Sequence, residues 1–254
     1  MTRARASPQR PLATTAATLS TNSPPLRMVH GDTMPGSEFD AVLLKAALVH
    51  GARWGAARTF LEPVHEDLGL QRARDAVARM VGYGRATPGR VLVCDEHLVT
   101  VLAAGRINKD DARTYRFPLP PSLSSRTDRR RATLTLAWLT PINPRHRYCR
   151  RAALKLEPAA PAGLLGKRTD ADIYGARRGT VQHEVLIGER AVPYAPGSAI
   201  EPVVSCRADA GALESQVPYA LLATVEVPPQ ANLPVYEEVR QALRVPVAVR
   251  AARA

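Results

Sequence analysis

The spacing of hydrophobic residues divides the chain into a helical first part and a strand-rich second part. Residues 41–50 follow a Ser37-x-x-Asp40 capping signal and are apolar on nearly every side, which predicts a buried helix. Residues 70–81 carry apolar residues at helical spacing, and Gly82-Tyr-Gly84 predicts the turn that ends this second helix. After residue 88 the hydrophobic runs become short and rich in branched residues, as in strands.

The second part consists of these short runs separated by turns that contain proline and glycine. We expect strands at residues 91–94, 97–102, 114–118, 132–139, 149–156, 180–187, 200–207 and 219–227, and a short helix at 236–243. Runs at such intervals are typical of an antiparallel sandwich. The predicted fold class is therefore α+β, with a short helical segment followed by an antiparallel β-sandwich or jelly-roll-like domain.

The same pattern predicts where the parts of the chain begin and end. Residues 1–36 mix Arg, Ser, Thr and Pro around no bulky apolar centre, so we expect a disordered basic leader and no secretory signal. The helical segment then spans residues 37–88, the β-sandwich accessory domain 89–230, and a C-terminal helix and tail 231–254.

Composition narrows the class of protein further. The chain has 254 residues, of which 45% are hydrophobic, and this suits one large domain or two small ones. We expect no membrane association, since no stretch approaches the roughly 18–20 uninterrupted apolar residues of a membrane span. The three cysteines are too few and too scattered for a disulfide framework or a four-cysteine zinc site, which favours a reducing, cytoplasmic compartment.

The positive charge is concentrated in two segments. The formal net charge is +12. Residues 1–30 hold four arginines and no acid, and residues 126–151 hold eight arginines against a single acid, Asp128. Such a cluster binds a nucleic-acid backbone, meets an acidic protein partner, or forms a solvated face. If residues 132–140 and 149–156 pair as a hairpin, the arginines fall into two groups at opposite ends of the first strand. The candidate partner-binding residues are Arg129, Arg130, Arg131, Arg145, Arg147, Arg150 and Arg151.

Three stretches resemble a known family. Val42-Leu-Leu-Lys-Ala-Ala-Leu-Val-His-Gly51, followed by Gly82-Tyr-Gly84, resembles the end of the catalytic domain of subtilisin-like serine peptidases. Thr133-Leu-Thr-Leu-Ala-Trp-Leu-Thr-Pro141 is similar to a strand of the jelly-roll domain that follows it in many subtilases. The stretch from Val91 to Val239 is similar to the C-terminal region of bacterial subtilases encoded beside AAA-type ATPases and linked to phage defence. The resemblance covers residues 37–245.

The resemblance implies a serine endopeptidase with an Asp, His and Ser triad, but the chain lacks the Gly-Thr-Ser motif that carries the nucleophile. The first functional prediction is therefore the C-terminal fragment of a subtilisin-like peptidase, inactive alone and with no catalytic residue. An AAA-type ATPase or a missing subtilase catalytic domain is the partner that this resemblance implies. The alternative is a non-catalytic β-sandwich module that uses its arginines to bind a protein or, less favoured, a nucleic acid.

Other reactive residues give no active site in the sequence. His183 falls in a strand where alternation predicts the solvent face or the sandwich rim, and His50 is expected to be a satisfied core or capping residue. Asp170-Ala-Asp172 with Gly175 is a fragment of a calcium loop without its remaining ligands. Each cysteine (Cys94, Cys149, Cys206) falls within or beside a predicted strand, where a buried thiol behaves as a small hydrophobe. We therefore expect no cofactor and no metal.

Overall fold

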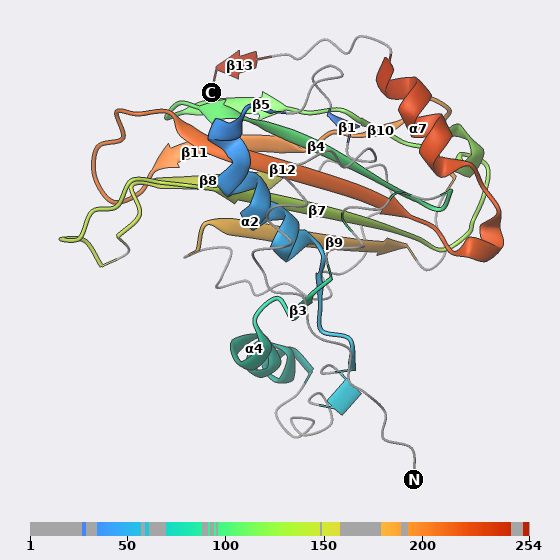
Figure 1. Ribbon diagram of the computed structural model, residues 1–254, viewed down its shortest axis with the longest axis horizontal. Coiled ribbons are helices and arrows are strands. Elements are labelled where there is room, and N and C mark those ends of the chain that lie inside the picture. The colour runs from blue at the N-terminus through green and yellow to red at the C-terminus, as the bar shows by residue number, and fades with distance from the viewer. Residues whose placement is uncertain are drawn as a thin grey trace.

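Long strands rich in Val, Leu, Ala and Thr form the centre of the molecule (Figure 1). The computed structural model describes residues 27–28, 35–56, 59–60, 70–87, 91, 94, 96–147, 149–157, 179–188, 193–244 and 251–253. Nearly all of the leader predicted at residues 1–36 lies outside these ranges, as does the calcium-loop fragment at 170–175.

The larger sheet has five strands in the order β1-β4-β12-β7-β9. Its neighbours are antiparallel except for the short β1, which is parallel to β4. The bounds of its strands are Arg27–Met28 for β1, Leu98–Ile107 for β4, Val217–Glu226 for β12, Arg130–Trp138 for β7 and Val181–Gly188 for β9.

The smaller sheet has four strands in the order β13-β5-β11-β8, and its neighbours are all antiparallel. These strands are β13 (Ala251–Arg253), β5 (Asp111–Thr114), β11 (Val203–Ala208) and β8 (Ala152–Glu157). Two further strands, β6 (Phe117–Pro118) and β10 (Ala199–Ile200), pair with each other. Two antiparallel sheets with few helices confirm the predicted α+β class with a β-sandwich.

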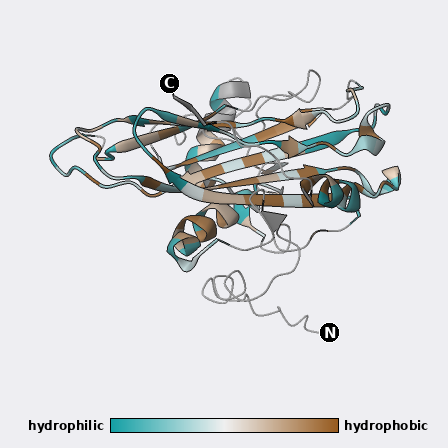
Figure 2. Cartoon of the chain, turned by 90° about the horizontal axis from the view of Figure 1, so that it is seen from above, coloured by the Kyte–Doolittle hydropathy of each residue, from teal (hydrophilic) through white to brown (hydrophobic). Residues whose placement is uncertain are grey.

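The hydrophobic core lies between the two sheets because side chains alternate along each strand. In β7, Leu134, Leu136 and Trp138 point inward and pack in one cluster with Leu154 of β8 and Val204 of β11. Figure 2 shows hydrophobic residues along the central strands and hydrophilic residues in loops at the ends.

The helix α2 (Asp40–His50) covers the outer face of the larger sheet, preceded by the short helix η1 (Ser37–Phe39). Its residues Val42 and Ala46 are fully buried, and they pack on small and aliphatic outward residues of β7 and β12 such as Ala137 and Leu222. The predicted buried helix is thus confirmed, with its apolar side seated on the sandwich itself.

A small satellite follows α2. The strands β2 (Ala52–Arg53) and β3 (Arg85–Ala86) pair, and α4 (Leu70–Val81) packs beside them around Trp54, whose indole N–H donates to Gly82 O at 2.8 Å. The predicted turn at 82–84 is confirmed. Gly84 has φ +93°, and a Cβ there would lie 2.3 Å from the carbonyl oxygen of Arg53, so only glycine fits.

The C-terminal part closes one end of the sandwich. The helix predicted at 236–243 is confirmed as α7 (Val235–Arg244), which follows η4 (Pro229–Ala231). The Glu238 carboxylate accepts hydrogen bonds from the backbone N–H and the hydroxyl of Ser122, in η3 (Pro121–Leu123), and so ties α7 to the strand connections.

The hairpin considered between residues 132–140 and 149–156 does not form. Both edges of β7 are already occupied, by β12 and by β9, so β8 pairs with β11 in the other sheet. The chain between them passes from one sheet to the other, with a single bridge between Ile142 and Arg150.

Smaller corrections concern strand limits. Val91 lies in a helical turn rather than in the strand predicted at 91–94, of which residues 92–93 fall outside the described ranges. The strand predicted at 200–207 is divided into β10 and β11 around Pro202, because proline has no N–H to donate to a ladder.

A glutamine side chain joins the edges of the two sheets. Gln182 of β9 accepts a hydrogen bond from the backbone N–H of Leu156 in β8 and donates to its carbonyl, both at 2.8 Å. It also donates to Glu184 at 2.8 Å. The amide thus takes the place of a neighbouring strand for one residue of the edge strand β8.

Candidate functional site

A row of buried polar side chains crosses the larger sheet beneath α2. His50, the last residue of α2, shares hydrogen bonds with Thr135 of β7 at 2.8 Å and with Thr224 of β12 at 2.6 Å. Thr224 continues to Thr100 of β4 at 2.7 Å, and Thr135 continues to His183 of β9 at 2.7 Å. We call these five residues the histidine–threonine row. It joins four neighbouring strands and one helix through side chains alone.

The row is buried and uncharged. His50 and His183 are each 3% exposed. Burial lowers the pKa of His183 to about 3, and the positive charges of Arg53 and Arg131 add to the effect. Burial, His183 and the same two arginines hold the pKa of His50 well below its usual value. Both imidazoles are therefore neutral at pH 7, so each ring has one donor and one acceptor nitrogen. His50 uses both nitrogens in the row, and His183 uses Nδ1.

The row corrects one prediction and confirms another. His183 does lie on the outward face of β9, but α2, together with the Tyr83 ring 6.0 Å from its own, shields it from solvent; the predicted solvent or rim position is wrong. The expectation that His50 is a satisfied core residue is confirmed. The three threonines could not be singled out as members of a polar cluster from the sequence, because threonine is a common residue on strands.

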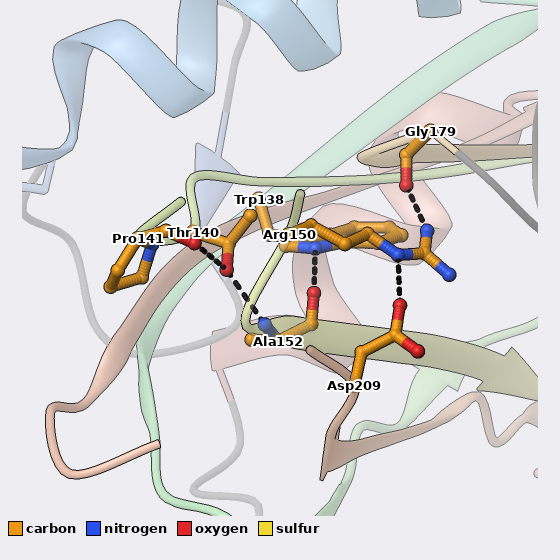
Figure 3. A network of polar contacts seen from close by, with 7 residues as sticks. All are labelled: Trp138, Thr140, Pro141, Arg150, Ala152, Gly179 and Asp209. Atoms are coloured by element: carbon orange, nitrogen blue, oxygen red, sulfur yellow. Dashed lines mark hydrogen bonds and ion pairs between the residues drawn. The ribbon is translucent and has the colours of Figure 1, made fainter. Parts of the chain in front are cut away.

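The chain between β7 and β8, residues 139–151, carries four of the seven candidate arginines and is called the arginine loop. Figure 3 shows how it is fixed at its base. Arg150 donates from Nε to Asp209 at 2.6 Å and from Nη1 to the carbonyl of Gly179. The Thr140 hydroxyl accepts from the backbone N–H of Ala152 at 2.8 Å and donates to the carbonyl of Pro141 at 3.1 Å.

Backbone contacts complete the base of the arginine loop. The Arg151 N–H donates to Pro141 O at 2.9 Å, and the Asp209 N–H donates to Arg151 O at 2.9 Å. Asn143 donates from its side-chain amide to Ala210 O at 3.0 Å, and its side-chain oxygen accepts from the Arg145 N–H. The loop is thus held in one shape by the turn that follows β11.

Three cationic and two apolar side chains of the arginine loop are exposed to solvent. Arg145, Arg147 and Arg151 are exposed, while Arg150 is 8% exposed and serves as the anchor. Leu139 is 40% exposed and Ile142 is 67% exposed, and both lie in the same loop as the three exposed arginines. Neither apolar residue was singled out from the sequence, because Leu139 falls at the end of the strand predicted at 132–139. The signal that could have marked Ile142 is its place next to Pro141, outside any predicted strand.

The remaining candidates gather at the opposite end of β7. Arg129 is exposed, and Arg131 is half-buried beside it. Arg130 is 1% exposed and lies over the ring of Tyr194 at 5.2 Å, and it donates to the carbonyls of Arg126 and Asp128. All three line a pocket of about 270 Å³ together with Glu226 and apolar residues. We call it the arginine pocket. The structure therefore does not bring the two arginine groups together.

The other reactive residues give no second site. Cys206 is buried in β11 as expected, and burial raises the pKa of its thiol to about 11. The expectation of a buried thiol is wrong for Cys149, which is exposed in the arginine loop and donates to the carbonyl of His146. Within the described ranges, no three His, Cys, Asp or Glu side chains stand close enough to share a metal ion. No helix in that part of the chain is long and apolar enough to cross a membrane.

Comparisons with known proteins leave the family open. No protein-family model matches the chain, and none of the curated proteins does.

Proposed function

We propose that the chain is a non-catalytic β-sandwich module that binds an acidic protein partner through the arginine loop. The observation that carries this proposal is the combination of Arg145, Arg147 and Arg151 with Leu139 and Ile142 on a loop fixed by its own hydrogen bonds. A preordered loop loses little conformational entropy on binding, so its contacts contribute more of their energy to affinity.

The apolar residues favour a protein over a nucleic acid. A phosphate backbone is met by charge alone, whereas a protein interface combines an apolar centre with a charged rim. Ile142 is more exposed than any other large apolar residue described except Phe60, and it lies among the arginines. The partner surface that complements the arginine loop is therefore one that combines acidic and aliphatic side chains.

The first experiment compares two classes of ligand by fluorescence anisotropy. A 20-residue peptide of alternating Glu and Leu clusters is expected to bind more tightly than a 20-nucleotide single-stranded DNA at 150 mM salt. The triple variant R145Q/R147Q/R151Q should weaken peptide binding at least tenfold, and Ile142→Ser about threefold. The matched control R72Q/R85Q/R207Q removes three exposed arginines elsewhere and should change the affinity less than twofold.

The salt dependence separates the alternatives. Binding of DNA falls steeply and linearly with salt on a logarithmic scale because counterions are released, and binding through mixed apolar and charged contacts falls less. If DNA binds more tightly than the peptide and the loop variant abolishes that binding, the module is a nucleic-acid binder and the proposal fails.

The second candidate is the C-terminal region of a subtilisin-like peptidase, as the resemblance implies. The order of a buried helix, α2, followed by a sandwich that contains the Trp138 strand is the arrangement that supports it. On either account the chain does not cleave peptide bonds, so a serine-directed fluorophosphonate probe should not label it. Labelling that disappears when one serine is replaced would contradict both accounts.

A further inference from the structure

The face of the larger sheet that α2 covers has a hydrophobic cluster of its own. Val42 and Ala46 of α2 pack on Ala137 of β7 and Leu222 of β12, whose side chains point away from the space between the two sheets. These four residues do not belong to the cluster between the sheets, which is built from the opposite faces of the same strands. The helix α2 can therefore leave the larger sheet while the core of the sandwich stays closed.

The histidine–threonine row fastens the C-terminal end of α2 to the sheet, and its hydrogen bonds fit neutral rings. The row has four contacts, between Thr100 and Thr224, Thr224 and His50, His50 and Thr135, and Thr135 and His183. The three hydroxyls and the one ring N–H of neutral His50 supply one hydrogen for each contact when the His183 proton is on Nε2. A further proton on either imidazole gives five donor hydrogens for four contacts, so one donor no longer has an acceptor within the row.

The charged groups that act on the two imidazoles are cations. Arg53 of β2 and Arg131 of β7 both oppose a proton on either ring, and Arg53 also donates to the backbone carbonyl of His50 at 3.2 Å. On α2 itself, the Lys45 ammonium donates to the carbonyl of Trp138 at 3.3 Å. A protonated ring under α2 therefore adds a positive charge to a region that already holds several.

The carboxylates of the adjoining strands are not among the groups that shift the two histidine pKa values. Glu184 follows His183 in β9, but its side chain points to the other face of the strand, where it accepts from Gln182 at 2.8 Å. Glu226 of β12 stands opposite Arg131 in the register of the sheet. A proton on either imidazole is thus stabilised by water rather than by a partner in the fold, and the rings become hydrated when α2 opens.

We propose that α2 is a cover of the larger sheet that acid releases. Proton uptake by His50 and His183 favours a form in which α2 has left β7 and β12, while the core between the two sheets stays closed. Opening exposes the apolar side chains of Leu102, Ala137 and Leu222, which belong to the cluster beneath α2 in the closed form. This inference is independent of the partner proposed for the arginine loop.

The test is hydrogen–deuterium exchange of the full chain at pH 7 and pH 5, followed by mass spectrometry and corrected for the intrinsic exchange rate. Between these pH values the opening constant of the α2 amides should rise about 25-fold for each imidazole, and several hundredfold for both, because the opened rings titrate near a pKa of about 6.5. At pH 5 it should also be at least tenfold larger than the opening constant of the β11 amides, which the sandwich core protects. Equal opening constants for α2 and β11 would show that α2 opens only with the whole fold, and this would overturn the proposal.

Variants assign the effect to the histidine–threonine row. His183→Gln leaves one titrating ring under α2 and should limit the rise in the α2 opening constant to about 25-fold. The double variant H50Q/H183Q should reduce the rise to less than twofold. The matched control His146→Gln, on an exposed histidine, should keep the full rise. Circular dichroism at pH 7 shows whether each variant is folded, and His183→Gln alone decides the question if the double variant is not. A rise that His183→Gln leaves undiminished, or an α2 opening constant that is equal at pH 7 and pH 5, would contradict the proposal.

Discussion

Lowering the pH from 7 to 5 is expected to reduce the free energy of unfolding by an amount on the order of 3 kcal/mol, through His50 and His183 alone. In the unfolded chain both imidazoles titrate near their ordinary pKa of about 6.5. In the folded protein burial holds the pKa of His183 at about 3 and that of His50 well below its usual value. Between these limits the unfolded chain binds more protons, so stability falls as the pH falls.

Urea denaturation followed by tryptophan fluorescence at pH 7, 6 and 5 measures this loss. His183→Gln removes one titrating group while an amide can still bond with Thr135, and it should reduce the pH dependence by about half. His146→Gln changes an exposed histidine and should leave the pH dependence as it is. A free energy of unfolding that is equal at pH 7 and pH 5 would show that the histidine–threonine row is not buried and neutral.

Replacing Asp209 by alanine is expected to cost about 3 kcal/mol of stability, because it removes the carboxylate that accepts a hydrogen bond from Nε of the buried Arg150 guanidinium at 2.6 Å. The Arg150 side chain is 9% exposed and that of Asp209 is 22% exposed, so solvent compensates poorly. The double variant R150M/D209L removes both charges and should be more stable than Asp209→Ala alone.

An exposed ion pair in the same chain is the control. Lys155 and Glu157 are 68% and 57% exposed, and Lys155→Ala should cost less than about 1 kcal/mol. Equal losses for Asp209→Ala and Lys155→Ala, measured by urea denaturation, would show that Arg150 does not fix the loop. Asp209→Ala should also weaken peptide binding by the arginine loop. Without the Arg150–Asp209 contact the base of the loop is less well fixed, and so are the positions of the three exposed arginines.

The elements of the fold were predictable where local pattern and burial agree. The helix at 40–50 and the strands around Trp138 and Leu221 follow directly from apolar spacing, because their hydrophobic residues meet the core. Which strands pair with each other was not predictable from the same pattern. The order β4-β12-β7-β9 places strands side by side that are far apart in the sequence, and β7 has no free edge for β8.

The candidate sites were predictable only as a segment rich in arginine. Whether an arginine is buried as an anchor or exposed on the surface depends on residues distant in the sequence. Tyr194 lies beneath Arg130, and Asp209 lies beside Arg150. The histidine–threonine row was not visible for the same reason. Thr100 stands opposite Thr224 in the register of β4 and β12, whereas Thr135 stands opposite Leu222 and is joined to Thr224 only through His50 of α2.

The central claim is that the arginine loop is the surface through which this module meets an acidic protein, and crosslinking in the source cell tests it most directly. A photoreactive benzoylphenylalanine replaces Ile142, and irradiated cells are analysed for adducts by mass spectrometry. We expect one defined protein adduct with an acidic surface, lost when Arg145, Arg147 and Arg151 are changed to Gln and retained in the R72Q/R85Q/R207Q control. Adducts that consist of nucleic acid, or that persist in the arginine-loop variant, would contradict the account.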